Sequence, residues 1–503
     1  MNFSCDMISA ILSGQLILDF SGKMKKISAA ILFLVVAISG INAQEEVYAT
    51  EKLSFCSNIY DEYAPVPFNK GLIFVGNMRT TFFYTYNNEK QKAPWTIFYV
   101  RKRGKTEWTE PDIWQDELKT NANDGPLTID TAGTIIYFSQ NYDAPKGLGN
   151  IRNQSRVGIF KAELVNKKWK NIVPFEHNDD KYSTMHPSLS PNGKLLFFSS
   201  NRRDGQGGFD IYVCKKTGDT WSEPVNLGPL VNTPGHEVMP FYQSTGRLFF
   251  SSNRHPGLGK YDIYYTENVD GVWVTPVNLG APINSKRDDI SFAADNKLKE
   301  GYFASDRDRR SASIYSFKLT APEFEVCEEQ KEPDYCFTFF EENTPETDTT
   351  NLVYEWRVEG KRIRGREAPY CFSRPGRYII ELNVIDLLTD SVMYNQATYD
   401  FLLEDEQQVY ITAPDTVFVD QTIHLDNNKT YLKNFEIERF YWDMGDDIHK
   451  SDTAVDHRYF KPGIYSVKCG ATSVADTPKK VKKTCSIKKI IVLPKPGFAK
   501  RED

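Results

Sequence analysis

An internal repeat of about 50 residues constrains this chain more than any other feature of its sequence. The letters FFSSNR occur at 197–202 and again at 249–254, and YFASDR follows at 302–307, so the copies lie 52 and 53 residues apart. Weaker copies occur earlier, as IYFSQN at 136–141 and IFVGN at 73–77. A fixed period of this length is typical of repeat architectures and makes an ordinary single-core fold improbable for this half of the chain.

Each repeat contains the signals of three or four short β-strands. The FFSSNR segment is followed by a second strand such as FDIYVC (209–214), and then by a Trp-led segment such as WSEPVNLG (221–228). Turns rich in Gly, Asn and Pro separate these strands. A four-stranded unit cannot bury both of its faces alone, whereas radial stacking around an axis buries them. The repeat therefore predicts an all-β fold that begins with a β-propeller of five or six blades.

The two ends of the repeat region are predicted to meet. Five units can be followed between Asp61 and Leu319, and the last of them has no Trp-led strand. The segment from Glu46 to Phe55 precedes the first unit and is able to supply the missing strand. We therefore expect this segment to close the ring, because without it only face contacts would hold the ring together.

The repeat motifs resemble a known family. S-P-N-G-K-L-L-F-F-S-S-N-R, G-x-G-G-F-D-I-Y and W-S-E-P-V-N-L-G are similar to the TolB-type WD-like propeller repeat, and more closely to its version in envelope proteins of Bacteroidetes. The resemblance covers about half of the chain. Relatives of this kind often carry an OmpA-like peptidoglycan-binding domain, and some are associated with type IX secretion or gliding machinery. We expect this chain to lack the OmpA-like domain, which weakens any expectation of peptidoglycan anchoring.

A second resemblance follows the repeats and implies two immunoglobulin-like β-sandwiches. The C-terminal segment with Tyr441-Trp442-Asp443-Met444-Gly445-Asp446, His457-Arg458-Tyr459 and Pro462-Gly463-Ile464-Tyr465 is similar to a PKD domain, and a degenerate copy with Tyr354-Glu355-Trp356 and Pro375-Gly376-Arg377-Tyr378 precedes it. In such a sandwich the tryptophan fills the core, the Gly-Asp pair makes a tight turn, and alternate residues of a strand share one face. The motif residues are Trp442, Asp443, Gly445, Asp446, His457, Tyr459, Pro462, Gly463 and Tyr465.

The chain divides into five segments. Met24-Lys25-Lys26 precedes an apolar run from Ile27 to Ile41 and a small residue at Ala43, which is the order of a secretory signal peptide. We assign 1–43 to this signal and an upstream extension, 44–320 to the propeller, 321–407 to the degenerate sandwich, 408–495 to the PKD domain and 496–503 to a basic tail. Export permits disulfide bonds.

Acidic residues occur at similar places in the loops that lead into the blades. They are Glu62, Asp124, Glu237, Asp288 and Asp289. Because the first strand of each blade lines the channel of a propeller, these carboxylates are candidates for a ring at one channel mouth, where they would hold Ca²⁺ or a basic peptide. The alternative is that each carboxylate caps a turn by accepting hydrogen bonds from backbone N–H groups. No other cofactor is indicated.

The cysteines allow specific pairs. Cys469 and Cys485 flank a hairpin centred near residue 477, so we predict a disulfide bond between them. Cys327, Cys336 and Cys371 allow one further bond, whose pairing the spacing does not decide.

The net charge of −6, from 61 Lys and Arg against 67 Asp and Glu, excludes a strongly basic nucleic-acid-binding protein. The resemblance to envelope proteins, together with the signal-peptide pattern, implies a non-enzymatic scaffold or protein-interaction module in the periplasm, at the outer membrane or at the cell surface. Its expected partners are envelope or outer-membrane proteins, and also glycan or peptidoglycan. The alternative is a carbohydrate-binding or carbohydrate-active propeller enzyme, which would need a convergent acid/base pair in an open cleft.

Overall fold

A computed structural model describes residues 47–78, 93–104, 107–120, 122–141, 156–308, 311–340, 351–474 and 481–495. The predicted signal peptide (1–43) and basic tail (496–503) lie outside these residues. The described chain consists of β-strands with one short 3-10 helix, η1 (Asp116–Leu118). None of its helices has the length and apolar character needed to span a membrane. The all-β prediction is confirmed.

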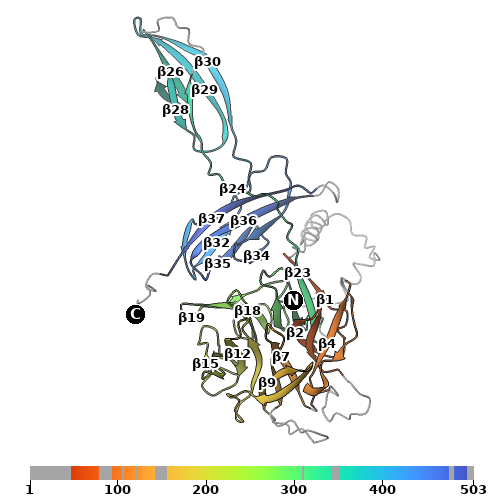
Figure 1. Cartoon of the computed structure of the whole chain (residues 1–503). Helices are drawn as coiled ribbons and strands as arrows, with labels where there is room; N and C mark the ends of the chain where they lie inside the picture. Colours follow the sequence, from red (N-terminus) through yellow and green to blue (C-terminus); the bar gives the residue numbers. More distant parts are fainter. Residues whose placement is uncertain are drawn as a thin grey trace, which may run out of the picture. The chain divides into compact units, whose positions relative to one another are not determined.

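Five sheets form the propeller, which the sequence predicted with five or six blades (Figure 1). Blade A holds β2 (Glu62–Phe68), β3 (Gly71–Gly76), β4 (Thr96–Arg103), β5 (Glu107–Trp108) and β6 (Asp112–Ile113). Blade B holds β7 (Asp124–Ile129), β8 (Ile135–Asn141), β9 (Val157–Val165) and β10 (Lys168–Pro174). Blade C holds β11 (Thr184–Leu189), β12 (Leu195–Ser200), β13 (Asp210–Thr217), β14 (Thr220–Trp221) and β15 (Val225–Asn226). Blade D holds β16 (Glu237–Tyr242), β17 (Arg247–Ser252), β18 (Asp262–Val269), β19 (Val272–Trp273) and β20 (Val277–Asn278).

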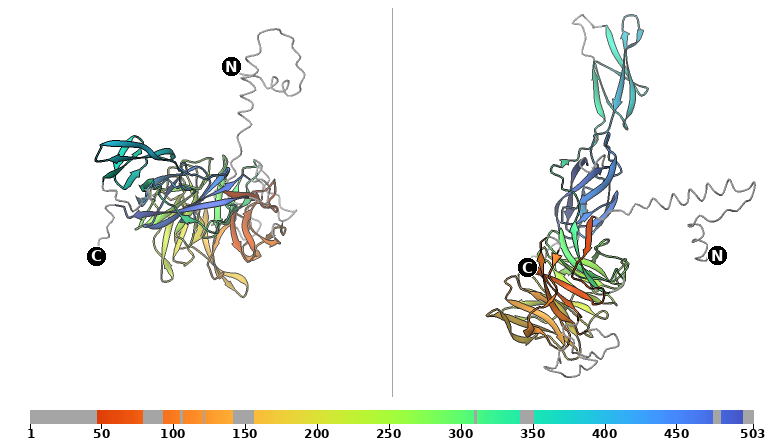
Figure 2. Two further views of the ribbon diagram at one scale, coloured as in Figure 1. Left: turned by 90° about the horizontal axis from the view of Figure 1, so that it is seen from above. Right: turned by 90° about the vertical axis from the view of Figure 1, so that its right-hand side faces the viewer.

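Blade E is completed by the strand from the other end of the repeat region. It holds β21 (Asp289–Ala294), β22 (Glu300–Ser305), β23 (Ser313–Leu319) and β1 (Tyr48–Lys52), which pairs antiparallel with β23. Figure 1 and the right-hand view of Figure 2 show the red β1 beside the green β23. The Tyr48 ring also packs edge-on against Phe317, with ring centroids 5.5 Å apart. The N-terminal segment therefore closes the ring, as expected.

The two phenylalanines of the repeat motif join neighbouring blades. Successive residues of a strand point to opposite faces of the sheet. In β12, Phe198 accordingly packs in a cluster with Tyr137 and Ile159 of blade B, whereas Phe197 packs in a cluster with Phe250 of blade D. Both phenylalanines of β12 are fully buried. This alternation explains why the motif carries two adjacent aromatic residues, since each blade has a neighbour on both sides.

The first sandwich has two sheets. The smaller pairs β25 (Cys336–Phe340) with β28 (Glu367–Cys371), and a disulfide bond joins Cys336 to Cys371. The larger has the order β27 (Lys361–Arg364), β26 (Leu352–Val358), β29 (Gly376–Asp386) and β30 (Ser391–Leu403). Trp356 is 1 % exposed at the centre of the core between them.

The second sandwich is built around two long strands, β36 (Gly463–Ser473) and β37 (Lys483–Leu493). The larger sheet also contains β33 (Ile437–Asp443), β34 (His449–Lys450), β31 (Thr416–Phe418) and β24 (Glu328–Glu329). The smaller sheet pairs β32 (Thr422–Asp426) with β35 (Ala454–Arg458). The short β24 lies parallel to β37, so a segment assigned from the sequence to the first sandwich contributes a strand to the second.

The predicted Cys469–Cys485 disulfide is wrong. The bond is instead Cys327–Cys485, and Cys469 is a buried free thiol. The register of the hairpin gives the reason, because Cys469 lies opposite Ser486 and Cys485 lies opposite Gly470. The two cysteines are thus one position out of register, and a shift of one residue places side chains on opposite faces of a sheet.

Candidate functional site

The innermost strand of every blade has the same irregularity. Each of these strands contains a β-bulge, seen as a register shift against its neighbour. A residue in the left-handed region, with φ between 53° and 89°, lies in each bulge, and proline follows it in blades A to D. Since proline donates no hydrogen bond, it suits a position where pairing is already broken. The left-handed residues are Ala64, Gly125, His186, Met239 and Ser291.

These bulges surround a cavity at the centre of the propeller. Its volume is about 310 Å³, and it is lined by residues of β2, β7, β11, β16 and β21. Among the residues that the structure describes, the lining contains no Asp, Glu, Lys or Arg, and it consists largely of proline, aliphatic and hydroxyl-bearing side chains. Several hydroxyls accept hydrogen bonds from the next blade, for example Ser291 Oγ from the Ala64 N–H at 3.0 Å and Ser188 Oγ from the Tyr242 N–H at 3.0 Å. The channel wall is therefore apolar and internally hydrogen-bonded.

His186 is the one ionisable imidazole of this wall. The residue is 9 % exposed, its N–H donates to Ser139 Oγ at 2.9 Å, and its buried Nδ1 has no hydrogen-bond partner among the described residues. Burial lowers the pKa of His186 to about 3, because an imidazolium ion would lose its hydration there. The imidazole is consequently neutral at physiological pH.

We expect the His186→Asn variant to lose less stability than the wild type when the pH is lowered. Between pH 6.5 and 3 the unfolded chain binds a proton on His186 that the folded protein does not bind. The free energy of unfolding therefore decreases as the pH falls, by at most about 1.4 kcal/mol per pH unit from this group. Asparagine tolerates the left-handed backbone and does not titrate. The wild-type calorimetric Tm should therefore fall more steeply than the Tm of the variant as the pH is lowered from 7 to 4. His424→Asn, at an exposed position, is the control, and parallel Tm curves for His186→Asn would contradict the expectation.

The predicted acidic residues serve a structural purpose and not ligand binding. Glu62, Asp124, Glu237 and Asp289 are each at most 1 % exposed at the first residue of an innermost strand. Each accepts hydrogen bonds from a Ser or Thr in the loop before it. The backbone N–H groups of Ser57, Thr120, Thr233 and Ser285 donate at 3.1, 2.7, 2.8 and 2.6 Å, respectively. This geometry favours the turn-capping alternative over a cation-binding ring.

The environment of these carboxylates agrees with a capping role. Burial raises the pKa of Glu62 to about 7 and that of Asp124 to about 6, although hydrogen bonds from Ser57 and Thr120 act in the opposite direction. Burial also raises the pKa of Glu237. Among the described residues, no group of three or more His, Cys, Asp or Glu side chains is arranged to hold a metal ion.

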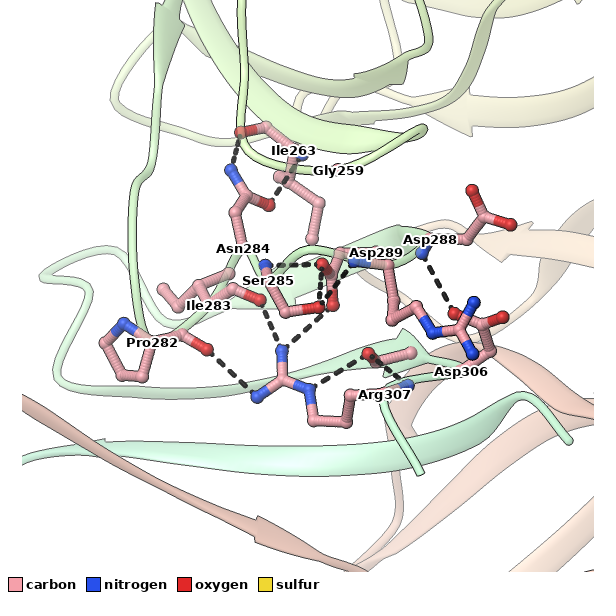
Figure 3. Close-up of polar contacts among 12 residues, drawn as sticks. Gly259, Ile263, Pro282, Ile283, Asn284, Ser285, Asp288, Asp289, Asp306 and Arg307 are labelled. Atoms are coloured by element: carbon pink, nitrogen blue, oxygen red, sulfur yellow. Dashed lines mark hydrogen bonds and ion pairs between the residues drawn. The ribbon is translucent and has the colours of Figure 1, made fainter. Parts of the chain in front are cut away.

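Blade E shows how the loop motif works (Figure 3). Asn284 mimics a strand partner, since its side chain accepts from the Ile263 N–H and donates to the Ile263 carbonyl, both at 2.8 Å. Asp289 accepts from Ser285 and from Arg307 Nη2, the latter at 2.9 Å. The other predicted acid, Asp288, is half-buried and accepts from the Tyr261 N–H of blade D at 3.2 Å. Asp288 therefore ties blade E to blade D, whereas Arg307 fixes the loop that leads into its own blade.

The PKD motif residues lie where the resemblance implies. Trp442 is 1 % exposed and donates from Nε1 to the Asp452 carbonyl at 2.8 Å, and Asp443 Oδ1 accepts from the Gly445 N–H at 2.9 Å in a turn where Gly445 has φ of 78°. Tyr459 donates to the Met444 carbonyl at 2.8 Å and stacks on Tyr465, with ring centroids 4.1 Å apart. Pro462 and Gly463 lead into β36.

Asp446 has a role that the motif does not show. It contacts the propeller through Arg247 of blade D, whose Nη2 donates to the Asp446 carbonyl at 2.6 Å and lies 3.2 Å from its carboxylate. His457 Nε2 lies 3.1 Å from the same carboxylate. Burial by itself would raise the pKa of Asp446, but His457 and Arg247 hold it below its ordinary value. The acidic turn of the sandwich is thus a docking contact with the propeller.

Further contacts extend this propeller–sandwich interface. Arg247 Nε donates to Glu267 at 3.0 Å, and Lys461 Nζ of the sandwich lies 2.8 Å from the other Glu267 oxygen. The rings of Tyr265 and Phe460 meet edge-on at 5.9 Å, and one apolar cluster contains buried residues of both domains. The sequence analysis missed Arg247 and Glu267. A signal was present, because the preceding repeat copy has Leu195 and Lys215 at the same two positions.

Comparison with known proteins bears on the sandwich and on the fold. A family model described as PKD domain matches residues 405–488, which confirms that assignment. A comparison with curated proteins finds no match. Three similar solved structures are a gluconolactonase from Xanthomonas campestris (11% identity, TM-score 0.33, covering 54% of this chain and 90% of that chain), an inulosucrase from Halalkalicoccus jeotgali (13%, 0.31, 51% and 78%) and a prolyl endopeptidase (10%, 0.27, 82% and 61%).

These comparisons correct one prediction. Most of the similar structures are enzymes by their descriptions, among them the three above and a sialidase from Trypanosoma rangeli, so the prediction that the chain is not an enzyme is contradicted. At these low identities and TM-scores the similarity concerns the fold and identifies no reaction for this chain. The TolB-type and Bacteroidetes features of the resemblance stay predictions.

Proposed function

We propose that this chain is an exported cell-envelope protein that binds other envelope proteins with one interaction body, formed by the propeller and the PKD domain together. The observation that carries the proposal is the buried contact between Arg247 and Asp446, which joins the two domains side chain to side chain. A module that serves only as a spacer has no need of a buried, charged docking contact. The joined surfaces offer a partner a larger area of fixed geometry than either domain alone.

The place of action follows from the sequence resemblance. The signal-peptide pattern and the similarity to Bacteroidetes envelope repeats support a location in the periplasm or at the outer membrane, in association with outer-membrane or type IX secretion components. A carbohydrate-binding or carbohydrate-active propeller is the alternative, and the same experiment distinguishes it.

Crosslinking in native envelopes, followed by purification of the tagged full chain, tests this proposal. We expect the wild type to recover a defined set of envelope proteins and Arg247→Met to recover less of the same set, because undocking separates the two halves of the surface. Arg103→Gln, which removes a positive charge from the exposed end of β4, is the matched control. Equal recovery with Arg247→Met would overturn the single-body proposal, and recovery of polysaccharide without protein would favour the alternative.

A further inference from the structure

The outer face of the larger sheet in the first sandwich carries an arginine-lined groove. The inner face of this sheet holds Trp356, Ile380 and Leu382 in the core, so the alternate residues of β26 and β29 point outward. The groove has a volume of about 500 Å³. Its lining includes Arg357, Arg362, Arg377, Ile379, Glu359 and Glu381.

The positive charge of the groove is only partly balanced within the protein. Arg357 and Arg362 are direct cross-strand partners, and like charges in that position destabilise a sheet. The nearest carboxylate oxygens of Glu355 and Glu381 lie 3.9 and 4.0 Å from Arg357, beyond hydrogen-bonding distance. The buried Arg357 Nε has no hydrogen-bond partner among the described residues. An external anion bound over the groove would relieve the repulsion between Arg357 and Arg362.

The other charged residues of the groove also leave it with a net positive charge. Arg362 forms no ion pair with any described residue, and the Arg377 contact with Asp400, at 3.4 Å, is exposed on both sides. Glu359 accepts a hydrogen bond from the Tyr370 hydroxyl at 2.9 Å. The segment 355–381 has seven Lys and Arg against four Glu, a local balance of +3 in a chain of net charge −6. A guanidinium group is suited to bidentate binding of carboxylates.

The position of the groove decides between classes of acidic ligand. β26 and β29 are interior to their sheet, and both have strand partners on each side, so an extended peptide has no free backbone edge to join there. The exposed Ile379 side chain, at 53 % exposure, adds apolar surface beside the charges. Alternating apolar and carboxylate groups are what a chain of uronic-acid sugars presents.

From this geometry we infer that the first sandwich binds an acidic, carboxylate-bearing polysaccharide in the groove formed by Arg357, Arg362 and Arg377. This site lies in a different domain from the propeller–sandwich interface, so it stands or falls independently of the function proposed above.

The test is binding of the full chain to alginate, a polymer of uronic acids, measured by calorimetry at low and at physiological salt. We expect binding that weakens with salt and an affinity about tenfold lower for the double variant Arg362→Gln/Arg377→Gln. Arg362→Lys, which keeps the charge without the planar fork, should fall between the two. Arg103→Gln is the matched control and should bind as the wild type does.

Both arginines of the double variant are exposed, so an unchanged Tm serves to show that the variant is folded. Equal alginate affinity of the wild type and the folded double variant would overturn the inference. It would also be overturned by equally tight binding of uncharged dextran, or by tighter binding of polyglutamate, which would identify the groove as a site for acidic peptides.

Discussion

Replacement of Arg247 by methionine is expected to lower the free energy of unfolding of the joined propeller and second sandwich by about 3–5 kcal/mol. Arg247 is 5 % exposed and serves two carboxylates, Glu267 on the neighbouring strand and Asp446 in the sandwich. Its removal leaves the largely buried Asp446 carboxylate without its guanidinium partner, with His457 and the Ile448 N–H still beside it, and the loss of a charged partner at a buried charge is costly. Methionine keeps most of the side-chain volume, so the decrease in the free energy of unfolding reports the lost charge contacts and not lost packing.

Differential scanning calorimetry of the full chain checks this expectation. The variant should show an earlier transition for the second sandwich, separated from that of the propeller. Adding Asp446→Asn to Arg247→Met should restore part of the loss, because the double change removes the stranded carboxylate. Arg103→Gln should leave the profile unchanged. A profile of Arg247→Met that coincides with the wild type would show that the contact contributes nothing to holding the domains together.

The second large effect is expected at the strand that closes the propeller. In an antiparallel pair, hydrogen-bonded and non-hydrogen-bonded positions alternate. The Leu53 N–H donates to Ile314 and the Val47 carbonyl accepts from Thr320, so Ala49 and Glu51 occupy the hydrogen-bonded positions of β1. Glu51→Pro removes a ladder donor and places the proline ring against β23, at a cost of about 3 kcal/mol or more. The propeller should then melt at a lower temperature.

Thr50→Pro is a sharp control because it lies one residue away. β1 is the outer strand of blade E, and the Thr50 N–H points away from β23 towards solvent, where proline is tolerated. We expect Thr50→Pro to keep the wild-type Tm and the wild-type resistance to limited proteolysis, and Glu51→Pro to lose both. Equal effects of the two substitutions would mean that β1 contributes through its side chains and not through the backbone pairing that closes the ring.

Local sequence patterns predicted those features that depend on residues near one another in the chain. The sequence analysis offered turn capping as the alternative for the acidic residues, and the structure shows that Ser57, Thr120, Thr233 and Ser285, four or five residues earlier, donate to them. The PKD motif likewise predicted the burial of Trp442 and the tight turn at Gly445. Such features were readable because a hydrogen bond across four residues has few alternatives.

Contacts between distant residues were not predictable in the same way. Cys485 has Cys327 and Cys469 as possible partners, and a shift of one residue in the register of β36 and β37 decides between them. The spacing of the acidic residues in the inter-blade loops suggested a ring of carboxylates. Whether those carboxylates are buried depends on how the loops fold back on the strands. Nothing in the motif around Asp446 indicates that Arg247, 199 residues earlier, faces it.

The amino-acid sequence by itself determined that this chain is a ring of repeated small sheets followed by two sandwiches. Strand periodicity, turn residues and repeat length are local properties, and they recur in every copy of the repeat. Only the tertiary structure decided which charged groups are buried together, which cysteines pair and which face of the first sandwich is left positive. Those outcomes depend on register and on the docking of domains, where one residue of shift or one rotated side chain exchanges a solvated charge for a buried one.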